Sequence, residues 1–123
     1  MSRLRTKIEY YKKTLLEEND LDASALEIFI TKHILHRLDN PSEDIEYALA
    51  IFNELANLRQ ESIDEILGMC FYINLWNEYE DRKEMFWHYL NDRSKKLYEE
   101  AVFLYTKGAT REEQVRYRKE NGL

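Results

Sequence analysis

Two pairs of carboxylates in the middle of the chain have a spacing that could hold a metal ion. Glu43 and Glu46 form the first pair, and after fourteen intervening residues Glu61 and Asp64 form the second. Within each pair the three-residue spacing places both side chains on one face of a helix. If the two helices adjoin and run antiparallel, the pairs lie near one end, where four carboxylates can hold Mg²⁺ and orient a water for attack on a triphosphate.

This spacing resembles that of the all-helical nucleotide pyrophosphohydrolases of the MazG type, whose motif is Glu-Glu-x-x-Glu followed by Glu-x-x-Asp. The resemblance implies a Mg-dependent hydrolase of nucleotides. Ser42 stands where the first glutamate of that motif would be. The same carboxylates also suit helix starts at Ser42 and Ser62, since acidic side chains stabilise the N-terminal end of a helix. The hydrolase is therefore an alternative hypothesis.

The histidines and the single cysteine do not form a recognisable metal or catalytic motif. His33 and His36 are three residues apart, and Glu84 and His88 are four apart, so each pair can share a helix face. A helical di-iron site needs two Glu-x-x-His motifs and further glutamates, and the sequence has no such set. Cys70 has no basic neighbour in the sequence that would lower its pKa. We therefore predict no catalytic residues, no metal and no cofactor.

The charges are distributed unevenly along the chain, and this pattern is the clearest indication of a partner. The net charge is −6, and residues 14–81 carry sixteen Asp and Glu against three Lys and Arg. A negative surface repels nucleic acid and attracts basic proteins. We therefore predict a non-enzymatic regulator or inhibitor that binds another macromolecule, in particular a basic protein that handles nucleic acid. The predicted contact residues are Glu17, Glu18, Asp20, Glu43, Asp44, Glu46, Glu61 and Asp64.

The two ends of the chain are basic and support a different hypothesis. Residues 1–13 carry five Lys and Arg against one glutamate, and residues 82–123 carry ten against seven acids. If the termini lie close together, these side chains form one patch for phosphates, as in a nucleic-acid-binding regulator. The residues assigned to this contact are Arg3, Arg5, Arg111, Arg116, Arg118 and Lys119.

Tyrosine is unusually frequent, with nine residues in a chain of 123. Tyr72, Tyr79 and Tyr89 fall beside or off the apolar stripes predicted for the core. Tyrosine is favoured in interfaces because it buries a large area with few rotatable bonds and keeps a polar group. We therefore predict a homodimer that associates through the first helix or through these three tyrosines.

The elements that must position these residues are all predicted to be helices. One proline and three glycines in 123 residues are too few for the many turns of a β-sandwich or barrel. The prediction is an all-α, compact antiparallel bundle of five to six helices, formed by one domain over residues 1–123. The first helix is expected over residues 2–18, and residues 109–123 are expected to form a short, weakly packed C-terminal helix.

Capping signals predict where the other helices begin and end. Ser, Thr or Asp followed three residues later by Glu is typical of a helix start. A helix is expected to stop before Pro41, and another at Gly108. Residues 62–107 supply most of the core, either as two long helices or as one bent helix. The caps predicted by this pattern are Ser24, Ser62, Asp81 and Thr110, and Ser42 is a predicted cap because Glu43, Asp44 and Glu46 follow it.

The location of the protein is predicted from what the sequence lacks. The basic N-terminal residues are not followed by the apolar run of a signal peptide. The longest uncharged stretch, residues 66–77, is about half the length of a membrane span. Cys70 has no second cysteine in the chain with which to form a disulfide. These features predict a cytoplasmic protein that does not enter a membrane.

Overall fold

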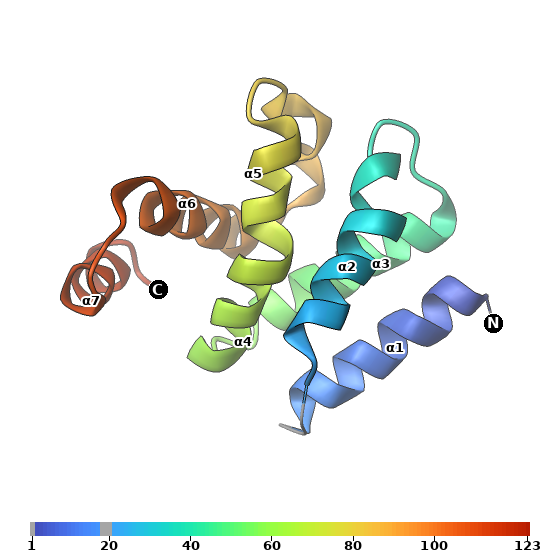
Figure 1. Cartoon of the computed structure of the whole chain (residues 1–123), viewed down its shortest axis with the longest axis horizontal. Helices are drawn as coiled ribbons and strands as arrows, with labels where there is room; N and C mark the ends of the chain where they lie inside the picture. The colour runs from blue at the N-terminus through green and yellow to red at the C-terminus, as the bar shows by residue number, and fades with distance from the viewer. Residues whose placement is uncertain (1, 18–20) are drawn as a thin grey trace.

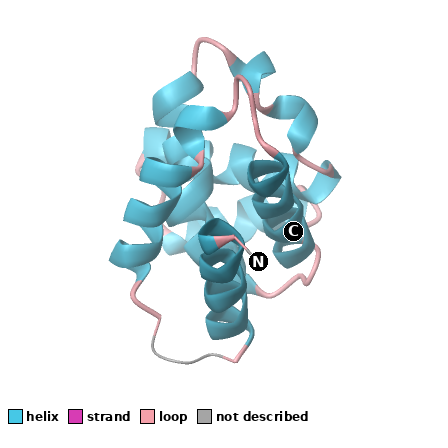
Figure 2. Ribbon diagram, turned by 90° about the vertical axis from the view of Figure 1, so that its right-hand side faces the viewer, coloured by secondary structure: helices cyan, strands magenta, loops and turns pink. Residues whose placement is uncertain are grey.

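The computed structural model describes residues 2–17 and 21–123, which fold into helices around one hydrophobic core (Figure 1). The chain is 78% helical, and the described residues contain no strand, which confirms the all-α prediction. The side view in Figure 2 shows these helices and the loops that join them. The α-helices are α1 (Arg3–Leu16), α2 (Ala23–His33), α3 (Glu43–Ala56), α4 (Glu61–Leu67), α5 (Ile73–Tyr79), α6 (Asp92–Lys107) and α7 (Arg111–Glu120).

Three of the predicted helix boundaries are confirmed. The hydroxyl of Ser42 accepts a hydrogen bond from the backbone N–H of Ile45 at the start of α3. Thr110 and Glu113 form the predicted capping box of α7. Gly108 ends α6 in the left-handed conformation with φ 59°, which is the usual conformation of a glycine that follows a helix.

Three other predicted caps are wrong. Asp22, not Ser24, caps α2, because its carboxylate accepts a hydrogen bond from the N–H of Ala25. The helix predicted from Ser62 begins at Glu61, and its N-cap residue makes no side-chain hydrogen bond. No α-helix begins at Asp81, because the chain forms two 3₁₀ turns there, Lys83–Met85 and Trp87–Tyr89.

Residues 62–107 form two helical segments, of which the first is irregular. α4 and α5 are joined by a π-helical turn over Gly68–Tyr72, so that they form one continuous rod (Figure 1). α2 packs on one side of this turn and α6 on the other. Because the turn is enclosed from two sides, three successive residues, Cys70, Phe71 and Tyr72, are buried. The residue before them, Met69, is 56% exposed.

A network of polar side chains fixes the loop between α5 and α6. Asn53 donates to the carbonyl of Tyr89 at 2.8 Å, and its side-chain oxygen accepts from the hydroxyl of Ser94 at 2.8 Å. That hydroxyl also accepts a hydrogen bond from the buried phenol of Tyr72. Asn91 caps α6 through the N–H of Ser94. The start of α6 is therefore positioned by α3 and by the π turn.

The single cysteine is part of this packing. The thiol of Cys70 donates a hydrogen bond to the carbonyl of Ala23 at 3.4 Å. Burial raises the pKa of Cys70 to about 11. A thiol with a raised pKa carries little thiolate at neutral pH and is a poor nucleophile. Cys70 is therefore a structural side chain between α2 and the π turn.

Substitution of two glycines by alanine should change the free energy of unfolding in opposite directions. We expect Gly108→Ala to lower the free energy of unfolding by about 1–2 kcal/mol, because an L side chain is strained at φ 59°. Gly68 has helical dihedral angles, and an added Cβ would lie 3.9 Å from Cβ of Ala101, an ordinary contact. Gly68→Ala should therefore raise the free energy of unfolding by up to about 1 kcal/mol. Urea unfolding of the two variants measures both effects, and a loss of stability in both would contradict the account of Gly68.

Candidate functional site

The two carboxylate pairs do not come together as the hydrolase hypothesis requires. Glu43 and Glu46 lie in the first turn of α3, whereas Glu61 and Asp64 lie in the first turn of α4, beyond the other end of α3. α3 has 14 residues, so its two ends are about 21 Å apart. Within residues 2–17 and 21–123, no three His, Cys, Asp or Glu side chains are grouped as metal ligands. The site implied by the MazG resemblance is therefore not formed.

Asp64 was predicted on the surface and is instead buried in an ionic network. Its exposure is 3%, and it accepts two hydrogen bonds from Arg93, at 2.9 and 3.0 Å. Arg118 donates to the same carboxylate at 2.7 Å and to Glu100 at 2.7 and 2.8 Å. Arg93 also donates to the carbonyl of Ala56. Two arginines and two carboxylates thus link α3, α4, α6 and α7.

The electrostatics of the network indicate a structural role. Burial raises the pKa of Glu100, and the hydrogen bond from Arg118 opposes this effect. Burial alone would lower the pKa of Arg118, but hydrogen bonds to Asp64 and Glu100 raise it. Every carboxylate oxygen of the network accepts a hydrogen bond from an arginine. Asp64 and Arg118 are both buried and form an ion pair with each other. The assignments of Asp64 to a partner surface and of Arg118 to nucleic acid are therefore wrong.

Other predicted acidic contacts are also neutralised within the chain. Asp44 accepts a hydrogen bond from Arg5 at 2.7 Å, and hydrogen bonds from Ser2 and Arg5 lower the pKa of Asp44. Glu61 pairs with Arg111 at 2.6 Å. Glu17, Glu43 and Glu46 are exposed, whereas Glu18 and Asp20 lie outside the described residues. The acidic surface is therefore smaller than the sequence predicts.

The basic ends do not combine into one patch. The start of α1, with Arg3 and Arg5, and helix α7 lie at opposite ends of the long axis of the molecule (Figure 1). Arg116 and Lys119 are exposed on α7, so they are far from the basic residues of α1. The prediction of a shared phosphate-binding patch is wrong, because it required adjacent termini.

Two of the three tyrosines predicted at an interface are in the core. Tyr72 has no exposed area and Tyr79 is 8% exposed. The phenol of Tyr72 donates to Ser94, and that of Tyr79 donates to the carbonyl of Leu35. Tyr89 is half-buried, with its ring 4.0 Å from that of His88. Tyr72 and Tyr79 cannot contact a second copy, because helices on both sides cover this part of the chain.

A groove between α1 and α2 is the most distinctive surface of the molecule. It has a volume of about 640 Å³ and joins basic side chains to an apolar floor, and we refer to it as the basic groove. Arg3 and Lys7 lie one turn apart on α1. Lys32 and Arg37 come from the end of α2 and the turn after it. The lining residues are Arg3, Leu4, Lys7, Tyr11, Ala25, Ile28, Phe29, Lys32, His33 and Arg37.

The charge of the basic groove is uniform. Arg3, Lys7, Lys32 and Arg37 are all exposed. Among the described residues that line the groove, none is acidic. The middle of the chain, which is strongly acidic in sequence, thus contributes two cations to a basic surface. A groove lined by charges of one sign concentrates ligands of the opposite sign.

The floor of the basic groove is apolar. The ring centroids of Tyr11 and Phe29 are 5.4 Å apart, and both residues are more than nine-tenths buried. Ile28 is 53% exposed although the next two residues, Phe29 and Ile30, are buried. Its exposure next to Lys32 gives the groove a hydrophobic contact surface.

Sequence reasoning did not identify the basic groove. In the charge pattern of the sequence, Arg3 and Lys7 belong to the basic residues 1–13, whereas Lys32 and Arg37 enter only the net charge of residues 14–81. The available signal was the spacing of four residues between Arg3 and Lys7, which places both side chains on one face of a helix.

Comparison with protein-family models, with curated proteins and with solved structures finds no match for this chain. No helix in residues 2–17 and 21–123 combines the length and apolar character of a membrane span.

Proposed function

We propose that the protein is a non-enzymatic regulator that binds an acidic, amphipathic helix of a partner protein in the basic groove. The observation that carries this proposal is the combination of exposed cations on both walls with an apolar floor and no acidic lining residue in the described part of the chain. An amphipathic helix laid into a hydrophobic groove is a common mode of peptide recognition. Acidic residues beside its apolar face would pair with Arg3, Lys7, Lys32 and Arg37.

This proposal replaces a basic partner by an acidic one. A basic partner would need a continuous acidic surface, but Asp44, Glu61 and Asp64 are paired with arginines of the same chain. The general role, regulation by contact with another macromolecule, is retained as part of the proposal. We also retain the cytoplasm as the proposed location, which a single free thiol at Cys70 supports. The homodimer stays a prediction.

An acidic protein helix suits the basic groove better than nucleic acid does. Single-stranded nucleic acid is held largely by stacking on exposed aromatic faces, but Tyr11 and Phe29 are 8% and 7% exposed. Phosphates also make no use of the apolar contact that Ile28 offers.

The proposal is tested by titrating the full chain with a labelled synthetic helix of about five turns. One face of the probe carries leucine and the other carries glutamate. We expect saturable binding that weakens as the salt concentration rises. A probe of the same composition with the leucines dispersed around the helix should bind much more weakly. Tighter binding to a DNA or RNA oligonucleotide than to the amphipathic probe would contradict the proposal.

A further inference from the structure

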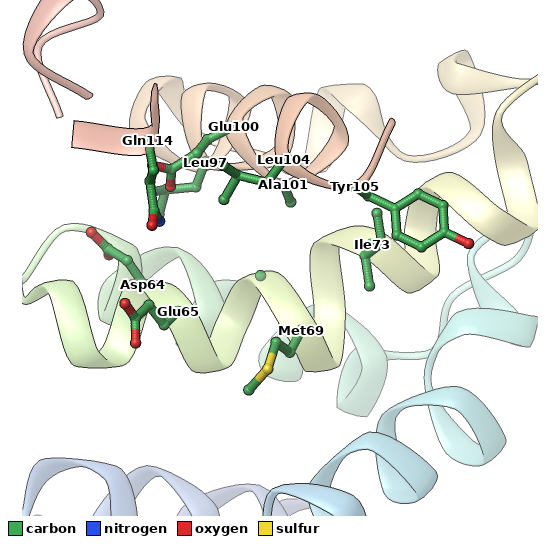
Figure 3. A pocket seen from close by; sticks show the side chains of 11 residues that line it. Asp64, Glu65, Met69, Ile73, Leu97, Glu100, Ala101, Leu104, Tyr105 and Gln114 are labelled. Carbon is green, nitrogen blue, oxygen red and sulfur yellow. The ribbon is translucent and has the colours of Figure 1, made fainter. Parts of the chain in front are cut away.

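A second groove lies between the α4–α5 rod and α6 (Figure 3), and we refer to it as the apolar groove. Its volume is about 410 Å³, within the range of ligand-binding clefts. Gly68 and Ala101 allow the two walls to approach closely. Met69 and Tyr105, on opposite sides of the groove in Figure 3, are 56% and 61% exposed. The remaining apolar lining residues are Ile73, Leu97 and Leu104.

Helix α7 already covers one end of the apolar groove. Gln114 of α7 lines this end together with Asp64 and Glu100 (Figure 3). Arg111 and Arg118 are seven residues apart, and so two turns apart on one helix face. Arg111 pairs with Glu61, and Arg118 pairs with Asp64 and Glu100. α7 thus presents two arginines to carboxylates on α4 and α6.

Few apolar contacts hold α7 in this position. Tyr117 stacks on Phe103 with ring centroids 4.5 Å apart and an interplanar angle of 16°. Val115 is 51% exposed. The link to α6 contains Gly108, whose left-handed conformation makes the sharp change of direction between the helices. Beyond Gln114 the apolar groove continues towards Ile73 and Tyr105, and α7 provides no residue to line that part.

From this arrangement we infer that α7 is an intramolecular occupant of a docking surface for a basic, amphipathic helix of a second protein. Two arginines, two turns apart on the incoming helix, form ion pairs with the carboxylates that Arg111 and Arg118 pair with when α7 is bound. Its apolar residues extend into the part of the groove that α7 leaves open. This site is separate from the basic groove and selects a partner of opposite charge.

The ionic network is suited to such an exchange. When α7 leaves, Asp64 keeps both hydrogen bonds from Arg93, whereas Glu61 and Glu100 lose the arginines with which they pair. The two arginines of the incoming helix restore both pairings. The exchange therefore replaces one set of ion pairs by an equivalent set and adds apolar contact. Because α7 is part of the same chain, it competes at a high effective concentration, which keeps the surface closed until a tighter ligand arrives.

The test uses a labelled peptide with the sequence of residues 109–123 as the ligand and full-length variants as receptors. Arg111→Gln combined with Tyr117→Ala removes the ion pairs of Arg111 with Glu61 and Glu65 and the ring stack of α7 but leaves the buried Arg118 in place. We expect this variant to bind the peptide at least about tenfold more tightly than the unmodified chain, because the competitor is weakened. The control variant, Val115→Ala with Arg116→Gln, changes exposed side chains of α7 and should bind as the unmodified chain does. A peptide carrying Arg118→Glu should not bind.

Amide hydrogen exchange and molecular mass complete the test. We expect the amides of α7 to exchange faster than those of α6 in the unmodified chain, because α7 opens without global unfolding. Equal protection of the two helices would overturn the inference, as would rapid exchange of α7 in the weakened variant without peptide binding. A mass of two chains that depends on α7 would also overturn it, since a second copy would then be the occupant. The peptide of residues 109–123 tests the apolar groove only. If it does not bind, the proposal that the basic groove binds an acidic helix is unaffected.

Discussion

Asp64→Asn is expected to lower the free energy of unfolding by about 3–5 kcal/mol, because the variant leaves two buried arginines without their shared carboxylate. Arg93 and Arg118 are 8% and 9% exposed, so water cannot replace the lost charge. The asparagine amide keeps the shape of the side chain, but its NH2 group donates at one of the two positions where a carboxylate oxygen now accepts hydrogen bonds from the arginines. The loss should therefore exceed that of a typical single substitution.

Urea unfolding followed by circular dichroism measures this effect. Asp44→Asn is the matched control, since it removes the same charge from an ion pair whose side chains are about one-third exposed. A pair in that position contributes about 0–1 kcal/mol. If the two variants lost equal stability, the network around Asp64 would not connect α4, α6 and α7 as described.

Lys7→Glu combined with Lys32→Glu is expected to weaken binding of the acidic amphipathic probe on the order of 100-fold, because two attractions across the interface become repulsions. The two lysines lie on α1 and α2, on opposite walls of the basic groove. Both side chains are exposed, so the substitutions should leave the stability of the fold nearly unchanged. Fluorescence anisotropy with the labelled probe measures the affinity.

The control for this variant is Lys96→Glu combined with Lys107→Glu. These two exposed lysines lie on α6, and neither lines the basic groove. The control lowers the net charge by the same amount, so it measures how much the overall charge of the protein, apart from the basic groove, contributes to the affinity for the probe. We expect a loss of affinity of less than about threefold at physiological salt, where exposed charges are largely screened beyond about 8 Å. Equal losses in the two variants would mean that the overall charge, and not the basic groove, attracts the probe.

The helical fold was predictable because local signals determine most of it. Ser42, Thr110 and Gly108 act through neighbours only a few residues away, and their predicted roles are confirmed. The apolar stripe of α3 also predicts its buried face, since Ile45, Ala48 and Leu49 are all in the core. Periodicity works for α3 because this helix is regular over its whole length and buries one side.

The π turn, the ionic network around Asp64 and the basic groove could not be predicted, because they depend on packing between segments that are distant in the sequence. The π turn over Gly68–Tyr72 is enclosed by α2 and α6, so no single stripe describes its burial. Asp64 and Arg118 are 54 residues apart in sequence, and nothing local distinguishes them from exposed charges. The basic groove unites α1 with α2, whose surrounding sequence is acidic. The net charge of residues 14–81 is strongly negative and does not show that Lys32 lies in a basic groove.

The most direct measurement of the central claim is the map of amide chemical-shift changes when the full chain is titrated with the acidic amphipathic probe. The account predicts that the shifts concentrate in α1 and α2, at residues that line the basic groove, such as Lys7, Ile28 and Lys32. They should saturate together with the anisotropy signal. Shifts confined to α4, α6 and α7, or no shifts at concentrations where the anisotropy saturates, would contradict the assignment of the basic groove as the binding site.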